Sequence, residues 1–376
     1  MIIIHIHHTF HPVLGGLERV VYSISKELVK LGHEVHVVTS IYGASNRPRY
    51  EEIDGIHVHR LRARTLAYLD LCIPREFPRD IIKRADVVHV HSHNSLFNLM
   101  IASVAKGYGV SIVVHFMAID ALLTHPNTVK RLLGFGYQRL ATLRAIRLAD
   151  VRLVKSFRDM YMLKLRYGVD AYYVPDGIDK VYFRIPVNPH LFLKKFKLEN
   201  TEYLFLYIGR LHPAKGPHIL VKAIPYLFKY GLRDFCIAIV GPGNTSWLKK
   251  LAKRLGVEKH VTITGPIPER LKISAIDAST CLVVPSLYDY VEVFSLTTSE
   301  AWARGKPVIA SKVGELAFRV KHGVNGLLVE PGNPQALAKA LQTIVETPLK
   351  PRGGNLLTWC QVAKELEKVY IVAKHI

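Results

Sequence analysis

Two carboxylates, Glu292 and Glu300, stand eight positions apart between two apolar runs that each indicate a buried parallel strand. The stretch therefore predicts a strand, a loop and a helix. Eight residues of helix rise about 12 Å, so the two carboxylates could contact opposite ends of one extended ligand. The amides of Val293, Phe294 and Ser295 would lie at the helix N-terminus, where partial positive charge favours anions and oxygen-rich groups. Two solvated surface charges would give the same pattern.

Two cations stand at another predicted junction of strand and helix. Gly209 and Arg210 follow an apolar run, and Lys215 comes five residues after the arginine, where a helix should begin. An arginine fork, a lysine and a helix N-terminus together suit a diphosphate, because they can offset its charge without a metal. The spacing is not that of a P-loop. The chain also contains no Asp-x-Asp triplet. We therefore expect no metal and no cofactor.

The N-terminal half offers a glycine pair and a histidine at similar junctions. Gly15 and Gly16 precede a helix pattern, but the GxGxxG fingerprint and its ribose-binding acid are missing. The pair predicts either a tight turn or amides that approach a phosphate. His115 ends a strand-like run, at the edge where open α/β sheets bind ligands.

Histidines at alternating positions raise the question of a metal site. His89, His91 and His93 would share one strand face, and with His115 they could hold a metal ion. The first two lie within a strand pattern, however, and His93 begins a loop. We therefore predict no metal ligands.

Length, composition and charge limit the class of protein. A chain of 376 residues with 49% hydrophobic residues predicts two ordered domains. The four cysteines form no CxxC spacing and no run of about 20 apolar residues exists, which favours a cytoplasmic protein without structural zinc. The net charge of +21 fits nucleic acid, an anionic membrane or a phosphate-bearing substrate equally well.

Apolar runs alternate with helix patterns along the whole chain and predict an α/β protein with two Rossmann-like domains. We place the N-terminal domain at residues 1–182 and the C-terminal domain at residues 183–355. A final helix is expected over residues 356–373. The predicted strands cover residues 2–8, 35–39, 57–61, 86–91, 111–115, 151–155, 203–208, 235–240, 260–264, 281–284 and 307–310.

These motifs, in this order, resemble the retaining glycosyltransferases of family four, which have the GT-B fold. The resemblance covers both halves of the chain and is carried by the Glu292/Glu300 pair and by four other segments, at residues 15–19, 174–179, 209–216 and 323–332. It implies transfer of a hexose from a nucleoside-diphosphate sugar, held in a cleft between the domains, to an acceptor hydroxyl. It also implies that the last helix crosses back onto the N-terminal domain.

The resemblance assigns roles residue by residue. Arg210 and Lys215 would hold the donor diphosphate, with Gly209 beside them. Glu292 and the amides after it would hold the hexose, Glu300 the ribose, and Ile267 the base through backbone groups. His115 would lie against the donor sugar, with the Gly15 and Gly16 loop facing the diphosphate and the acceptor. Asp176, Glu315 and Phe318 depart from the family pattern.

Basic residues gather between Arg60 and Arg84, where Arg60, Arg62 and Arg64 alternate ahead of a Leu/Tyr/Ile cluster. This composition suits either an anionic membrane surface or a solvated loop. We expect reversible membrane docking there, on the inner face of the cell membrane, with a lipid-linked acceptor. A soluble sugar acceptor is the alternative. The helix over residues 127–148 is also basic, but two arginines fall within its apolar arc, so we do not predict a membrane helix.

Two other functions remain open from the sequence. A nucleotide-sugar epimerase uses a similar two-domain frame and would release an altered free sugar without an acceptor. A nucleic-acid-binding protein is suggested only by the net charge, and no basic-aromatic recognition motif supports it.

Overall fold

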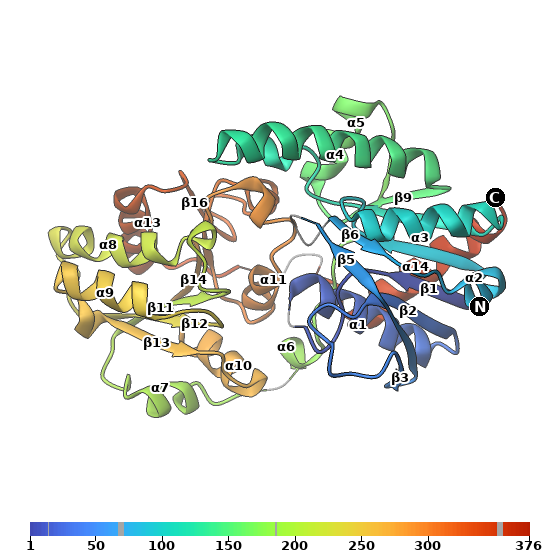
Figure 1. The fold of residues 1–376 in the computed structure, drawn as a ribbon. Coiled ribbons are helices and arrows are strands. Elements are labelled where there is room, and N and C mark those ends of the chain that lie inside the picture. Colours follow the sequence, from blue (N-terminus) through green and yellow to red (C-terminus); the bar gives the residue numbers. More distant parts are fainter. Residues whose placement is uncertain (14, 67–70, 185, 352–355) are drawn as a thin grey trace. The chain divides into compact units, whose positions relative to one another are not determined.

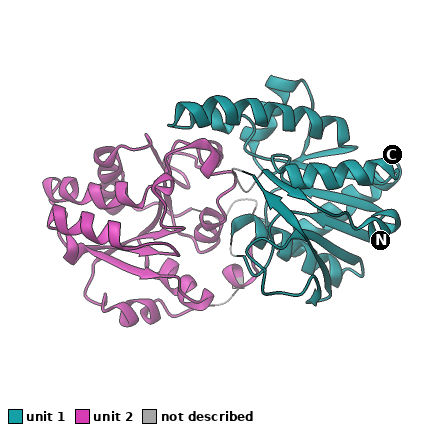
Figure 2. Ribbon diagram, viewed as in Figure 1, with its two compact units in different colours: residues 1–177, 357–376 teal, residues 178–356 magenta. Residues whose placement is uncertain are grey.

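The computed structural model describes residues 1–13, 15–66, 71–184, 186–351 and 356–376. The chain forms two compact units (Figure 2). Unit 1 comprises residues 1–177 and 357–376, and unit 2 comprises residues 178–356. The sequence-based boundary lies five residues further along the chain, after residue 182.

Unit 1 is built on an eight-stranded sheet in the order β10-β9-β8-β7-β1-β2-β4-β3 (Figure 1). All neighbours are parallel except β3 and β4. The strands are β1 (Ile2–Ile6), β2 (Glu34–Ser40), β3 (Tyr50–Ile53), β4 (Ile56–Leu61), β7 (Val87–His91), β8 (Ser111–Phe116), β9 (Val151–Val154) and β10 (Tyr172–Tyr173), with β5 (Ala63–Thr65) and β6 (Cys72–Pro74) as a separate pair. The helices are α1 (Gly16–Lys30), α2 (Arg79–Arg84), α3 (Leu96–Gly107), η2 (Ala121–Thr124), α4 (Thr128–Leu148), α5 (Phe157–Tyr167) and α14 (Trp359–Lys374).

The two faces of this sheet differ in chemistry. On one face, alternate apolar side chains of β1, β7 and β8 pack with α3 and α4 in a hydrophobic cluster. On the other face, α14 packs against α1, β7 and β8, and the strand residues beneath it include His5, His89 and His115, all buried. The last helix thus completes unit 1 by covering a polar layer.

Unit 2 contains a six-stranded, wholly parallel sheet in the order β13-β12-β11-β14-β15-β16. The strands are β11 (Tyr203–Ile208), β12 (Phe235–Val240), β13 (Val261–Gly265), β14 (Cys281–Val284), β15 (Val308–Ser311) and β16 (Gly326–Val329). The helices are α6 (Val181–Arg184), α7 (His190–Phe196), η3 (Pro213–Lys215), α8 (Pro217–Lys229), α9 (Ser246–Leu255), η4 (Glu258–His260), α10 (Glu269–Ala278), η5 (Asp289–Val291), α11 (Leu296–Ala303), α12 (Leu316–Arg319) and α13 (Pro334–Glu346).

Helices cover both faces of this second sheet, which explains its continuous apolar strands. Alternate residues of β11 point to opposite sides: Phe205 and Tyr207 join one cluster with α8, α9 and α13. Leu204 and Leu206 join the other with α10 and α11. The α/β class with two Rossmann-like sheets, predicted from the sequence, is confirmed.

Candidate functional site

The loops that follow β11 and β14 meet at the point where the order of the second sheet reverses. From β11 the chain passes to β12 on one side, while β14 lies on the other side of β11. The helices that follow, α8 and α11, cover opposite faces of the sheet. Open α/β sheets bind ligands at such a switch point, beyond the carboxyl ends of the strands.

Lys215 and Glu292 form an ion pair at this switch point. The distance between Lys215 Nζ and Glu292 Oε1 is 2.8 Å, and Nζ also donates to the carbonyl of Val291 at 3.0 Å. Ser286 Oγ donates to the same carboxylate oxygen at 2.6 Å. Glu292 is buried, while Lys215 keeps 22% of its side-chain surface exposed. A cation with solvent access, held beside a buried carboxylate, can contact phosphate and sugar oxygens.

Backbone geometry brings this pair together. Lys215 lies in the 3-10 turn η3, just before α8, rather than at the start of the helix as predicted. Gly216 follows with φ +72°, and a Cβ there would lie 1.9 Å from the carbonyl oxygen of Pro285. Only glycine allows this approach of the two loops. Arg210 is exposed, and Tyr207 holds its carbonyl by a 2.7 Å hydrogen bond.

The segment after Glu292 leads into helix α11. The helix begins at Leu296, so Val293 and Phe294 precede it and Ser295 is its N-cap, at φ +63°. A serine rarely adopts this left-handed conformation, and such strain is typical of functional loops. Arg319 Cζ lies 4.0 Å from the centroid of the Phe294 ring, and the guanidinium of Arg319 donates to Ser299 Oγ at 2.7 Å. Sequence reasoning missed Arg319 and Ser286, because neither lies in a recognised motif.

Glu300 is fully buried on α11. Its Oε1 accepts a hydrogen bond from Lys272 Nζ at 3.1 Å, and the same ammonium lies 3.1 Å from Glu269. Ile267, predicted to contact a base, is half-buried just before α10. The structure thus places Lys215 and Glu292 in contact and holds Glu300 by a separate lysine. The predicted role of Glu300 toward a ribose stays a prediction.

Glu315, one of the three departures from the family pattern, lies in the loop after β15 and contacts the backbone of Glu292. Gly314 donates its amide to Asp289 Oδ1 at 2.8 Å, and the amide of Glu315 donates to the carbonyl of Glu292 at 2.9 Å. Glu315 is buried and Phe318 is half exposed. The loop after β15 therefore supports the backbone of Glu292 directly.

Unit 1 has its own switch point, between β1 and β7. After β1, which ends at Ile6 rather than at His8 as predicted, the chain reaches Gly15, the N-cap of α1. A Cβ on Gly15 would lie 2.0 Å from Glu18 Oε2, whereas one on Gly16 would meet nothing within 4 Å. Because the contact is with the end of a flexible side chain and Gly15 has an extended backbone, at φ −156°, the structure shows no strict requirement for glycine at either position.

A layer of histidines lies beneath α14. His89 is hydrogen bonded to Tyr370 at 2.6 Å and to His115 Nδ1 at 3.2 Å, and His5 Nδ1 lies 2.7 Å from His91 Nε2. Burial lowers the pKa of His5 and of His115 to about 3. Neutral imidazoles are therefore expected throughout the layer, and the buried Nε2 of His115 has no hydrogen-bond partner among the described residues.

Three of these histidines have the spacing of metal ligands. His5, His89 and His91 offer ring nitrogens within 4.8 Å of one another. This set differs from the His89, His91, His93 and His115 set considered above, because His93 leaves the strand and accepts a bond from the amide of Met117. The grouping contains no carboxylate, and hydrogen bonds already occupy nitrogens on all three rings. We assign it a structural role.

Asp176, the third departure, forms a buried ion pair with Lys155. The ammonium nitrogen lies 2.8 Å and 3.1 Å from the two carboxylate oxygens. The positive charge of Lys155 also contributes to the lowered pKa of His115, after burial. The carboxylate at position 176 therefore neutralises a lysine inside unit 1.

The prediction that Arg60 faces a membrane is wrong. Arg60 ends up buried in β4, where it pairs with Glu51 at 2.5 Å and donates to the carbonyl of His11 at 2.7 Å. The chain turns after β4, so Arg62 and Arg64 are exposed while Arg60 is not. Part of the expected apolar cluster, residues 67–70, lies outside the described residues.

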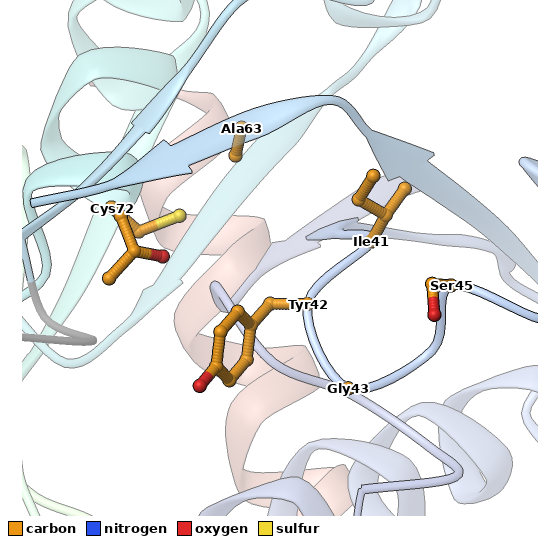
Figure 3. Close-up of a pocket in the computed structure, with 7 residues that line it drawn as sticks. Ile41, Tyr42, Gly43, Ser45, Ala63 and Cys72 are labelled. Carbon is orange, nitrogen blue, oxygen red and sulfur yellow. The ribbon is translucent and has the colours of Figure 1, made fainter.

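A pocket of about 320 Å³ opens in unit 1 beside the loop that follows β2. Figure 3 shows its lining, with the loop of Ile41, Tyr42 and Ser45 on one side and Ala63 with Cys72 on the other. The lining is mostly apolar, with hydroxyl groups from Tyr42, Ser45 and Thr65. Such a pocket suits a small group that carries both an apolar part and hydroxyls.

Comparisons with known proteins agree with this architecture. The model of the family Glycosyltransferase Family 4 matches residues 14–181, and that of Glycosyl transferases group 1 matches residues 191–353. A D-inositol 3-phosphate glycosyltransferase of Frankia alni is 30% identical over 372 residues, which cover 89% of this chain and 86% of that protein.

Solved structures show the same fold. Sucrose-phosphate synthase from Thermosynechococcus elongatus superposes with a TM-score of 0.78 at 22% identity, covering 99% of this chain and 98% of that one. Anabaena HepE in complex with UDP and glucose gives a TM-score of 0.72 at 19% identity, with 98% of both chains covered. The two family models together match most of the chain, and the Frankia alni relative is 30% identical over 89% of it, so the chain belongs to the family-four, group 1 glycosyltransferases.

Proposed function

We propose that this glycosyltransferase is a retaining, metal-independent hexosyltransferase that uses a nucleoside-diphosphate sugar. The observation that carries the proposal is the Lys215–Glu292 pair at the switch point of unit 2, at 2.8 Å. A lysine with solvent access beside a buried carboxylate offers one group for a diphosphate and one for sugar hydroxyls. HepE, crystallised with UDP and glucose, supports a donor of this class.

The proposed reaction breaks the bond between the anomeric carbon and the diphosphate oxygen. The acceptor oxygen bonds to that carbon on the same face, and the acceptor proton passes to the departing diphosphate. Lys215 and Arg210 stabilise the charge that develops on the diphosphate, and one such preorganised donor is typically worth about 3–4 kcal/mol. The neutral His115 can hold a sugar hydroxyl, because burial keeps its pKa at about 3.

Unit 1 supplies the acceptor side in this proposal, and we propose a lipid-linked acceptor. The pocket beside the loop after β2, with its apolar lining and three hydroxyl groups, supports an acceptor that joins an apolar part to a polar one. A free sugar would leave the apolar lining unused. An organic extract of membranes should therefore accept radiolabelled hexose, and transfer only to water-soluble sugars would contradict this part of the proposal.

A thermal-shift screen tests the donor. UDP, GDP and ADP, each with and without a hexose, are added to the protein in the presence of EDTA. A bound ligand at 100 times its dissociation constant stabilises the fold by about 2.7 kcal/mol. Stabilisation by at least one nucleotide sugar that persists in EDTA is expected. No shift with any of them, or a shift that requires added divalent metal, would contradict the proposal.

A further inference from the structure

A chain of hydrogen bonds links the last helix of unit 1 to His115. The hydroxyl oxygen of Tyr370, on α14, lies 2.6 Å from Nδ1 of His89, and Nε2 of His89 lies 3.2 Å from Nδ1 of His115. All three side chains are buried. We call these three residues the tyrosine–histidine chain. It ends at Nε2 of His115, which forms no hydrogen bond among the described residues.

Strand register and helix packing bring the three side chains together. His91 lies opposite His115 in the parallel pairing of β7 and β8, and His89 stands two residues earlier on the same face of the sheet. The rings of His89 and His115 are therefore diagonal neighbours, and they stack with their centroids 5.3 Å apart. Helix α14 packs against both strands and places the Tyr370 hydroxyl on the far side of His89.

The Tyr370 hydroxyl sets the direction of the hydrogen bonds. Burial raises the pKa of Tyr370 well above its usual value, so the hydroxyl keeps its hydrogen. Among the described residues its one hydrogen-bond partner is Nδ1 of His89. If the hydroxyl accepted a hydrogen bond from Nδ1, its own hydrogen would be buried without an acceptor, which folded proteins avoid. Tyr370 therefore donates to His89.

This direction fixes the tautomer of both histidines. Burial lowers the pKa of His89 and of His115, so each ring is neutral and carries one N–H. Because the lone pair on Nδ1 of His89 accepts from Tyr370, His89 carries its hydrogen on Nε2 and donates it to Nδ1 of His115. His115 is then left with its own hydrogen on Nε2.

A neighbouring carbonyl favours the same tautomer of His115. Burial, and after it the charge of Lys155, lower the pKa of His115, whereas the carbonyl of Val174 acts in the opposite direction. A carbonyl oxygen accepts hydrogen bonds and cannot donate them. It therefore favours a hydrogen on Nε2, because Nδ1 already faces His89.

We propose that Tyr370 is a positioning residue, which acts through His89 to hold His115 in the tautomer with its hydrogen on Nε2. In this form His115 donates a hydrogen bond to an oxygen of the hexose in the sugar nucleotide. The identity of that ligand rests on the proposed function, whereas the tautomer follows from unit 1 alone. Without the hydroxyl, either tautomer of the two histidines leaves Nδ1 of His89 unpaired, so the preference between them is lost.

Nitrogen-15 NMR of the whole chain, labelled at histidine, tests the tautomer directly. Protonated and bare ring nitrogens of neutral histidine have well-separated chemical shifts, and a His115→Ala variant identifies the signals of His115. In the wild-type protein at neutral pH, without any ligand, we expect the hydrogen on Nε2 and a bare Nδ1. A hydrogen on Nδ1 of His115 would overturn the proposal without the need for any variant of Tyr370.

Tyr370→Phe keeps the ring and removes the hydroxyl. The His115 signals should then show a mixture of both tautomers. If the tautomer with hydrogen on Nε2 falls to between one half and one tenth of the population, the dissociation constant of the sugar nucleotide rises about 2- to 10-fold. Isothermal titration with UDP-glucose and UDP, or with the pair that the thermal-shift screen selects, measures this change. The bare nucleotide should bind as before. Equal losses for both ligands, or an unchanged tautomer, would overturn the proposal.

A double-mutant cycle separates positioning from packing. In a His115→Ala background, Tyr370→Phe should cause no further loss of affinity for the sugar nucleotide, because the hydroxyl acts only through His115. Additive losses in the cycle would show that Tyr370 acts in another way and would overturn the proposal.

Tyr50→Phe is the matched control. The hydroxyl of Tyr50 lies 2.9 Å from Nδ1 of His57, so it forms the same kind of bond in the same unit, but Tyr50 is exposed and lies on the edge strand β3. This variant should leave both the tautomer of His115 and the affinity for the sugar nucleotide unchanged. A loss equal to that of Tyr370→Phe would contradict the assignment to Tyr370.

The two kinds of failure stay distinct. Melting curves show whether Tyr370→Phe is folded, and the wild-type tautomer tests the tyrosine–histidine chain even if it is not. If no sugar nucleotide binds the wild-type protein, the proposed function fails, while a hydrogen on Nε2 of His115 still supports the chain.

Discussion

At the scale of single residues, the pairing of Lys215 with Glu292 explains how one site can hold ligand groups of two kinds. The ammonium already has a carboxylate and the Val291 carbonyl as partners. A diphosphate that arrives must compete with these groups or add to them, and the partial exposure of Lys215 leaves room for it. The lysine is thereby oriented before the ligand binds.

Lys215→Ala should lower kcat/KM by about 10- to 160-fold. A charge-assisted hydrogen bond contributes about 1.5–3 kcal/mol, and its loss falls on the departing diphosphate. Lys222→Ala is the matched control, because Lys222 is exposed on α8, the helix that follows η3. Steady-state kinetics with melting curves separate catalysis from stability. Unchanged kcat/KM in a folded Lys215→Ala protein would contradict the assignment.

Glu292→Gln and Glu300→Gln should affect different ligands. Glu300→Gln should weaken binding of the bare nucleoside diphosphate about tenfold or more, because a ribose hydroxyl loses a charged acceptor. Glu292→Gln should weaken only the sugar-bearing donor, and the bare diphosphate should bind at least as tightly, since Lys215 loses its carboxylate partner.

Glu269→Gln is the control for Glu300→Gln, because both carboxylates lie 3.1 Å from Lys272 Nζ. It should leave nucleotide affinity unchanged. Isothermal titration with the nucleotide and with the sugar nucleotide gives the four affinities. Equal losses for bare nucleotide in Glu292→Gln and Glu300→Gln would rule out the division of roles.

At the scale of secondary-structure elements, the close approach of the Gly216 turn to the loop after β14 holds the site together. Gly216→Ala should destabilise the protein by several kcal/mol, because the left-handed backbone and a methyl group at 1.9 Å from the Pro285 oxygen both oppose it. Gly231→Ala is the matched control: its φ is +89°, but no atom lies within 4 Å of the added Cβ. It should cost only about 1–2 kcal/mol. Urea unfolding compares the two, and equal losses would show that the contact with Pro285 is unimportant.

Elements with strong apolar patterns were predictable. β11, β12 and β14 occupy the predicted residues, and α4 begins one residue after the predicted start. The short strands β3, β5, β6, β10 and β16 were missed, since segments of two to four residues are too short to carry a recognisable pattern. At the candidate site the residue types were predictable, but not the partners: nothing in the spacing indicates that Lys272 holds Glu300 or that Arg319 holds the α11 loop. The orientation of α4 could not be inferred, because its buried face is the less hydrophobic one.

At the scale of the whole molecule, the two units differ in their histidines. Unit 1 contains 14 of the 19 histidines. Burial lowers the pKa of His5, His93 and His115 to about 3. In the unfolded chain these groups titrate near 6.5, so between about pH 3 and pH 6.5 the unfolded state binds more protons and stability falls as pH falls.

Unit 1 should therefore unfold before unit 2 on acidification. At about pH 5 each of these three histidines should lower the free energy of unfolding by about 2 kcal/mol, because the loss is 1.36 kcal/mol for each pH unit below about 6.5. Above about pH 7 their contribution is complete and constant. Tryptophan emission separates the units, because Trp359 lies in unit 1 and Trp247 and Trp302 in unit 2. Coincident acid transitions of Trp359-only and Trp247-only variants would contradict this order.

The placement of α14 in unit 1 also has a consequence for synthesis. Residues 357–376 complete unit 1, yet the ribosome makes them after every residue of unit 2. Until Tyr370 emerges, the layer around His5, His89 and His91 lacks the helix that covers it. Unit 2 is a single continuous segment and can close its sheet on its own. During translation unit 2 can therefore fold before unit 1 is complete, because one face of the unit 1 sheet stays uncovered until residues 357–376 have been made.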